Sequence, residues 1–304
     1  MYTPVRPSRV ERITIRHTVE YQLRWWKRAE HAGSERPVLV LAHGWMDVGA
    51  SFQFVVDHLA RDRDIVALDW RGFGGSRQPT PVDSYWFGDY YGDLDAVIEH
   101  VSPSAPVDLL GHSMGGNVVM TYAGSRPARI RRLINLEGFG MAEPPPSSAP
   151  ARLTTWLDEL KAPKRMRGFA TQADVIDNLR TKNPRLSAAH AAWLSDHWAE
   201  PGADGRWHVQ GDPVHKGVNP VLYRRAEALA AWAAIQCPVL WAEGANTHSD
   251  RESRGASPFP RAEFEERLGA VRSVRRAIID DCGHMLHYDQ PAALAQLIED
   301  FLDD

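Results

Sequence analysis

Residues 107–120, VDLLGHSMGGNVVM, place one serine between glycines directly after an apolar run. The segment Gly111-His-Ser113-Met-Gly115 fits the pattern G-x-S-x-G, with a predicted strand before it and a predicted helix after it. The glycines leave room for a sharp strand-to-helix turn, which holds the serine in a strained conformation. Such a helix directs its N-terminal N–H groups at any oxyanion formed beside the serine. Ser113 is therefore the candidate nucleophile, and the alternative is a small residue in a tight turn.

Short apolar runs like the one before Ser113 recur along the chain. They cover residues 37–43, 64–70, 106–112, 130–139, 238–244 and 274–280. Unbroken runs of this length are typical of strands that are covered on both faces. Helical patterns lie between them, at residues 50–61, 89–101, 115–125, 261–269 and 291–302. This alternation predicts an α/β fold with an open, mostly parallel sheet and helices on both faces. Residues 10–28 alternate instead, which predicts an N-terminal hairpin.

The alternation stops between residues 140 and 235. This interval opens with the proline-rich AEPPPSSAP (142–150) and then shows only helical patterns. These patterns cover residues 151–161, 171–181, 186–200 and 219–235. We therefore expect a core of residues 1–139 and 236–304, with a helical cap of residues 140–235 inserted above the strand ends, where open α/β sheets bind ligands. The alternative is an independent helical domain that takes no part in the site.

Composition and charge narrow the classes of partner. The 304 residues carry a net charge of −4, with 43% hydrophobic and 24% charged residues, as in an ordinary globular protein. There is no basic excess to attract nucleic acid or an anionic membrane. No apolar block has the length of a signal peptide or a membrane helix. We expect a cytoplasmic protein that acts on a small molecule. Cys237 and Cys282 have no partner at metal-ligand spacing, so we expect structural thiols and no metal site.

A serine hydroxyl needs a base within hydrogen-bond reach to act as a nucleophile at neutral pH. The best candidate is His284, which follows the last predicted strand and precedes the last predicted helix. His287 is the second candidate, three residues further along.

Four motifs together resemble the α/β-hydrolase superfamily. They are HGW (43–45), DWRGFGGS (69–76), GHSMGG (111–116) and the late GH (283–284) before a helix. The resemblance covers essentially the whole chain, the inserted cap included, and implies the α/β-hydrolase fold. It also implies an oxyanion hole made by the N–H groups of Trp45 and Met114. The glycine-rich DWRGFGGS lacks a following Gly-Lys-Ser/Thr, so we expect it to shape the mouth of the site and not to bind phosphate.

The acid that would orient His284 departs from the common pattern of that family. Most members place an aspartate three positions after the glycine that is Gly244 here, and this position holds Thr247. A subset that includes haloalkane dehalogenases takes the acid from the strand after the nucleophile helix, which maps to Glu137. A carboxylate at the end of an apolar run needs a partner, and an imidazole N–H is a suitable one. We favour Glu137, and keep Asp250, Glu243 or a water-mediated arrangement as alternatives.

A serine at position 113 sets the chemistry apart from that of haloalkane dehalogenases and related epoxide hydrolases, which carry an aspartate there. The resemblance then implies acyl transfer by Ser113, His284 and Glu137 without a cofactor or a metal. We expect a serine hydrolase that cleaves a small or medium carboxylic ester, apolar or aromatic. The same machinery serves carbon–carbon bond hydrolases, lactonases, amidases and perhydrolases. A non-catalytic ligand-binding protein with the hydrolase fold is the rival from another class.

The predicted cap suggests how such a substrate is recognised. Seven tryptophans are candidates for an apolar site: Trp45, Trp86, Trp156, Trp193, Trp198, Trp207 and Trp232. Arg165 and Arg167 are candidates for binding a substrate carboxylate. An aminopeptidase would instead need an acidic cap residue near the pocket, such as Glu159 or Asp196. In helical segments such residues more often belong to the core or to a solvated face.

Overall fold

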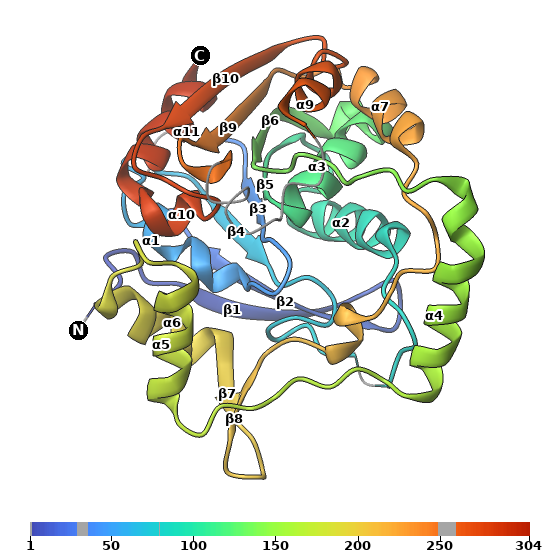
Figure 1. The fold of residues 1–304 in the computed structure, drawn as a ribbon. Coiled ribbons are helices and arrows are strands. Elements are labelled where there is room, and N and C mark those ends of the chain that lie inside the picture. The colour runs from blue at the N-terminus through green and yellow to red at the C-terminus, as the bar shows by residue number, and fades with distance from the viewer. Residues whose placement is uncertain (1, 29–35, 79, 249–259) are drawn as a thin grey trace.

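The computed structural model describes residues 2–28, 36–78, 80–248 and 260–304. Within these residues the centre is a sheet of eight strands in the order β1-β2-β4-β3-β5-β6-β9-β10 (Figure 1). The strands are β1 (Arg9–Ile15), β2 (Val19–Trp26), β3 (Leu39–Ala42), β4 (Ile65–Leu68), β5 (Val107–His112), β6 (Ile130–Leu136), β9 (Val239–Gly244) and β10 (Val274–Ile279). The hairpin β1–β2 joins β4 in antiparallel fashion, and all other neighbours are parallel. The predicted α/β fold is confirmed.

The strands of the sheet centre are mainly apolar because both of their faces are covered. In β3, Leu39 and Leu41 pack with α1 and α11, whereas Val40 and Ala42 pack with α2 and α3 on the opposite face. Successive side chains of a strand point to opposite faces, so a strand between two helical layers has few positions for a polar residue. Asp108 of β5 is such a residue, and it is paired with Arg63 and Arg131. Because these strands are parallel, their carboxyl ends lie at the same edge of the sheet, and the candidate nucleophile follows β5 at this edge.

The core contains six helices in the described residues: four match the predicted patterns, one is shorter than predicted, and one, a single turn before the last helix, was not predicted. They are α1 (Gln53–Val56), α2 (Phe87–Val101), α3 (Met114–Ser125), α9 (Arg261–Leu268), α10 (Leu286–Asp289) and α11 (Pro291–Asp303). The helix predicted over residues 50–61 is wrong in extent: a 3-10 turn over Gly49–Phe52 leads into the single turn of α1. Every residue from 49 to 56 is buried, so this segment packs on all sides and has no exposed helical face to extend.

The inserted interval lies between β6 and β9, as expected, but it is not purely helical. Its elements are α4 (Ala149–Lys161), α5 (Gln172–Lys182), α6 (Ala188–Trp198), β7 (Ala199–Pro201), β8 (Trp207–Val209) and α7 (Arg225–Ala233). The pattern for residues 186–200 misses the hairpin β7–β8, and α7 is shorter than the predicted 219–235. The turn of the hairpin contains Gly205 at φ 74°, and Gly202 N–H donates to Arg206 O at 2.7 Å. Glycines are typical of tight turns, so Gly202 and Gly205 are the sequence signal for the hairpin that a search for helical periodicity overlooks.

The inserted interval rests on the core at several points. In Figure 1, α4 runs along one side of the molecule, and α5 and α6 lie at another, beside α1. Buried residues of α5 and α6 form one cluster with Val48, Ala50 and Phe54. The interval also meets the glycine-rich loop that precedes α2, where Phe73 bridges to Gly211 and Gly74 N–H donates to Gln210 O. None of the helices in the described residues is long and apolar enough to cross a membrane.

Candidate active site

The turn between β5 and α3 holds Ser113 in a backbone conformation that side chains rarely adopt, with φ 52° and ψ −113°. Its N–H donates to Leu136 O at 2.8 Å, and its carbonyl accepts from Asn117 N–H at 3.0 Å, so the turn is bonded on both sides. A Cβ on Gly111 would lie 2.4 Å from Gly115 O, and one on Gly115 would lie 2.3 Å from Ala42 O. The glycines of the motif are therefore required by crowding, as the sequence predicts.

The structure brings the three predicted residues of the site into one hydrogen-bonded series. Ser113 Oγ lies 3.0 Å from His284 Nε2, and His284 Nδ1 lies 3.0 Å from Glu137 Oε2. A carboxylate can only accept, so the Nδ1 position carries the proton and Nε2 keeps a lone pair for the serine hydroxyl. The imidazole thus has the tautomer that a base for Ser113 requires. The series runs from a partly exposed serine to a carboxylate whose side chain is fully buried.

Glu137 is held by more than the histidine. It directly follows β6 at φ 61°, and its Oε1 accepts from Gly244 N–H at 2.8 Å and from Thr247 Oγ1 at 2.7 Å. One carboxylate oxygen is therefore fixed by two donors, and the other faces His284. Thr247 is the residue that sequence reasoning missed. It occupies the position after β9 at which the resemblance places an aspartate, and here its hydroxyl donates to Glu137, the carboxylate that follows the neighbouring strand β6.

The other candidates for acid and base lie elsewhere. Both carboxylate oxygens of Glu243 bind the guanidinium of Arg261, at 2.6 and 2.7 Å. His287 is buried with its Nε2 at 3.2 Å from Asp47 Oδ2. Asp250 lies outside the described residues.

The loop that carries Trp45 packs against the serine turn. A Cβ on Gly44 would lie 3.2 Å from Ser113 Cβ. His43 fixes the start of the loop, because its Nε2 accepts from Trp70 N–H at 2.9 Å while its Nδ1 bonds Gly44 O at 2.7 Å. Trp45 and Met114 both line the cavity beside Ser113. This proximity suits the predicted pair of N–H donors.

A buried network ties this loop to the segment that carries His284. The carboxylate of Asp47 accepts from Ser51 Oγ at 2.9 Å and Tyr288 OH at 2.7 Å, and it also bonds His287. Burial alone would raise the pKa of Asp47, but the hydrogen bonds from His287 and Tyr288, together with the electrostatic effect of His287 and His43, outweigh it and the pKa is lowered. The network therefore fixes the loop that carries Trp45 and the segment that carries His284 relative to each other.

His112 adds a second tie behind the histidine. Its Nε2 bonds the backbone carbonyl of His284 at 2.8 Å. Burial, followed by the nearby His287 and His284, holds the pKa of His112 well below its usual range. Asp47, His112 and His287 are all buried, with one potential ligand atom from each within 4.8 Å of the others, so among the residues that the structure describes they form a group that could ligate a metal. The hydrogen bonds of Asp47 with Ser51, His287 and Tyr288 already account for the placement of its carboxylate.

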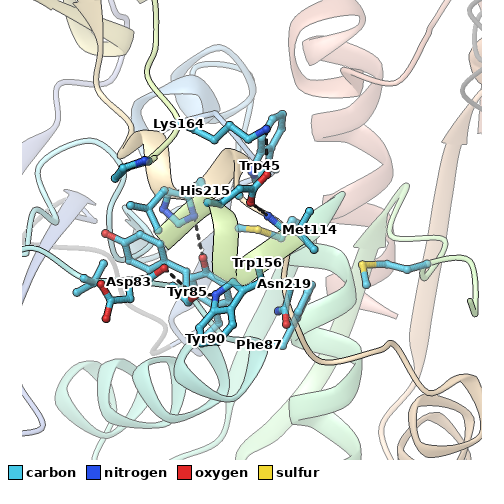
Figure 2. A pocket seen from close by; sticks show the side chains of 18 of the residues that line it. Trp45, Asp83, Tyr85, Phe87, Tyr90, Met114, Trp156, Lys164, His215 and Asn219 are labelled. Carbon is cyan, nitrogen blue, oxygen red and sulfur yellow. Dashed lines mark hydrogen bonds and ion pairs between the residues drawn. The ribbon is translucent and has the colours of Figure 1, made fainter. Parts of the chain in front are cut away.

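A cavity of about 390 Å³ opens beside Ser113 and Met114. Figure 2 shows side chains from the core and from the inserted interval turned toward it, Tyr85 and Phe87 from the first and Trp156 from the second. Of the predicted tryptophans, Trp45 and Trp156 line this cavity, Trp86 and Trp232 line a neighbouring one, and Trp193, Trp198 and Trp207 line neither. Apolar and aromatic walls suit an uncharged substrate group.

Two of the charged residues at this cavity, Glu159 and Lys164, are paired with each other, and a third, Asp83, is exposed. Glu159 lines the wall, but its Oε1 binds Lys164 Nζ at 2.9 Å and its Oε2 accepts from Val218 N–H at 2.7 Å. These hydrogen bonds lower the pKa of Glu159. Asp196, the other predicted acid, does not line the cavity and accepts from Gln172. Arg165 and Arg167 are also absent from the lining, in which Lys164 is the nearby cation.

His215 is a partly buried wall residue of the same cavity. Its ring stacks between Phe73 and Tyr85, with centroid distances of 3.8 and 3.9 Å. Its Nε2 lies 3.2 Å from Arg71 O, and its Nδ1 lies 3.3 Å from Tyr90 OH. Burial lowers the pKa of His215 to about 3, so the ring is neutral at physiological pH.

This lowered pKa predicts a loss of stability in acid. Between about pH 6.5 and pH 3 the unfolded chain binds a proton at His215 that the folded protein excludes, so the free energy of unfolding falls as the pH falls. We expect His215 to account for about 2 kcal/mol of the loss between pH 7 and pH 5. Urea unfolding of the wild type and of His215→Phe at both pH values measures it. Equal losses in the two proteins would contradict the assignment.

Comparisons with known proteins agree with this architecture. A family model described as the alpha/beta hydrolase fold matches residues 37–291. A serine hydrolase-like protein of Dictyostelium discoideum is 24% identical over 290 residues, which cover 88% of this chain and 75% of that protein. A 3-hydroxybutyrate-oligomer hydrolase of Cupriavidus necator is 27% identical over 276 residues, covering 85% of this chain and 86% of that protein. The crystal structure of a hypothetical protein of Pseudomonas aeruginosa PAO1 matches with a TM-score of 0.81 and 27% identity, over 97% of this chain and 99% of that one.

Proposed function

The chain belongs to the alpha/beta hydrolase fold family, and from this premise we propose that it is a serine hydrolase that cleaves a small or medium carboxylic ester, apolar or aromatic, through an acyl-enzyme. The observation that carries the proposal is the series Glu137–His284–Ser113, with both of its contacts at 3.0 Å. Acyl transfer by a serine needs a base that activates the nucleophile and an acid that orients the base, and the series supplies Ser113, His284 and Glu137 for these roles.

In the first half of the reaction, Ser113 Oγ attacks the ester carbonyl and gives its proton to His284 Nε2. The negative charge that develops on the carbonyl oxygen is stabilised by the N–H groups of Trp45 and Met114 and by the N-terminal end of α3. Glu137 stabilises the imidazolium as it forms and keeps the ring in place. His284 then donates the proton to the leaving alcohol, and the acyl group stays on Ser113.

In the second half, water takes the place of the alcohol. His284 accepts a proton from this water, and the resulting hydroxide attacks the carbonyl of the acyl-enzyme, whose oxygen lies at the same oxyanion site. His284 then returns the proton to Ser113 Oγ as the carboxylic acid leaves. The ties of Asp47 and His112 to the histidine segment support this cycle, because they hold His284 at one position through both halves.

We propose further that residues 140–235 act as a cap that selects the substrate. Trp156, Lys164, His215 and Asn219 of this interval line the cavity beside Ser113. An aminopeptidase would need a free carboxylate for the substrate amine. Glu159 is already engaged by Lys164 and the Val218 N–H, whereas Asp83, which also lines the cavity, is exposed, so measured rates for ester and amide substrates must separate the two classes.

Labelling by a fluorophosphonate tests the proposal against a non-catalytic binding role. We expect rapid labelling of the folded protein, confined to Ser113, because the probe reacts with a serine that an adjacent base activates. Mass spectrometry of the labelled peptides locates the adduct, and Ser113→Ala serves as the control. A folded wild-type protein that takes up no label would favour the binding role.

Substrate class needs a separate measurement. p-Nitrophenyl esters, a matched anilide and a lactone can be compared by kcat/KM at one pH. The ester is expected to be the best of the three, and faster hydrolysis of the anilide or the lactone would move the proposal to an amidase or a lactonase with the same machinery.

A further inference from the structure

A second cavity lies next to the one that contains Ser113, and the reaction described above makes no use of it. Its volume is about 450 Å³. Its walls come from α2, α3 and α7 and from the segments around residues 141 and 222, and they include Tyr91, Leu222, Tyr223 and Trp232. We call it the distal cavity. Its surface is mainly aromatic and aliphatic, as in sites that bind an apolar group.

The two cavities meet at a shared wall. Phe87, Asn117, Gly140, Met141 and Asn219 line both of them. Asn117 lies one helical turn after Ser113 in α3, and its Oδ1 accepts from Gly140 N–H at 2.8 Å. Figure 2 shows Phe87 and Asn219 on the same side of the first cavity. This shared wall, the neck, is therefore the boundary that a substrate group must pass to reach the distal cavity from Ser113.

The direction of the neck distinguishes the two arms of an ester. The leaving oxygen takes its proton from His284, so the alcohol arm lies beside the imidazole. No residue of the segment 282–289, which carries His284, lines either cavity. The linings extend from Ser113 to residues of α2 and α7 and, apart from Ser113 itself, include none of the residues around the imidazole. The acyl arm is the one that points in this direction.

We propose that the distal cavity binds the acyl chain of the substrate, so that the preferred substrates are esters of uncharged, medium-chain carboxylic acids. This inference rests on the proposed function, because it requires acyl transfer at Ser113. The charged residues of the lining are Arg152, Arg224 and Glu227. Arg224 and Glu227 are exposed, and Arg152 Nη1 donates to Asn219 O. The chain is thus recognised by burial of its methylene groups.

A series of p-nitrophenyl esters from acetate to dodecanoate tests the proposal. Each methylene that enters an apolar site contributes about fourfold to binding, so kcat/KM should rise by about this factor per methylene once the chain passes the neck, and should level off when the cavity is full. A parallel series of acetate esters with alcohols of increasing length should show no such rise. A rise in the alcohol series alone would overturn the assignment of the acyl arm.

Two substitutions on one helix provide the matched comparison. Ala228 lines the distal cavity, whereas Ala226, two residues earlier in α7, is exposed and does not line it. Ala228→Trp should lower the ratio of decanoate to acetate kcat/KM at least tenfold, and Ala226→Trp should keep the wild-type ratio. Ala142→Trp fills the same cavity from its other side and serves if the first variant folds poorly.

The outcomes separate this inference from the proposed function. Hydrolysis of the acetate with a flat acyl series, or equal ratios for Ala228→Trp and Ala226→Trp, would overturn the distal cavity as the acyl site and leave the serine hydrolase standing. A folded protein that hydrolyses no ester and takes no fluorophosphonate label would overturn the proposed function itself.

Discussion

Replacement of Glu137 by glutamine is expected to lower kcat for a p-nitrophenyl ester by about 10⁴-fold while the protein stays folded. The reason lies in the two donors at Oε1. Gly244 N–H and Thr247 Oγ1 require an oxygen at that position, so the amide nitrogen of the glutamine must face His284 Nδ1. An amide N–H there makes Nδ1 the acceptor and places the ring proton on Nε2, which can then no longer accept from Ser113.

Two control variants sharpen this result. Thr247→Val removes one donor but keeps the carboxylate, so its loss of kcat should be much smaller than that of Glu137→Gln. Asp250→Asn should be nearly silent. If Asp250→Asn abolishes turnover and Glu137→Gln does not, Glu137 is not the acid. Circular dichroism and urea unfolding show whether each variant keeps the fold.

Replacement of Ser113 by alanine or glycine should remove turnover almost completely, by about 10⁶-fold, because the nucleophile itself is lost. The two variants should differ in stability. At φ 52° and ψ −113° a Cβ is strained, and glycine adopts such a conformation freely. We expect Ser113→Gly to be more stable than Ser113→Ala by about 1 kcal/mol in urea unfolding. Equal stabilities would mean that the turn stores no strain.

The sequence predicts the core of the fold because its signals are local. Apolar runs such as residues 37–43 and 106–112 have too few polar positions for a strand with one wet face, and they become β3 and β5 in the interior of the sheet. Parallel strands align their carboxyl ends, so the positions of Ser113 and Glu137 at the ends of β5 and β6 make them neighbours. Pattern and topology together thus bring these residues close.

The features that the sequence does not predict depend on contacts between distant segments. Residues 49–56 form only short turns because they are buried on every side, which periodicity does not reveal. The hairpin β7–β8 begins directly where α6 ends, and its turn is marked by Pro201-Gly202 and Asp204-Gly205, which helical periodicity does not register. The donation from Thr247 to Glu137 joins residues 110 positions apart. A threonine in place of the expected aspartate is the one signal that could have suggested it.

The order of these residues along the chain separates chemistry from selectivity. Ser113 and Glu137 precede the stretch 140–235 and His284 follows it, whereas Trp156 and His215 at the substrate wall belong to it. Under the proposed function, a foreign stretch placed between the same two junctions would change the cavity wall, and with it the preferred substrate, without altering the reacting groups.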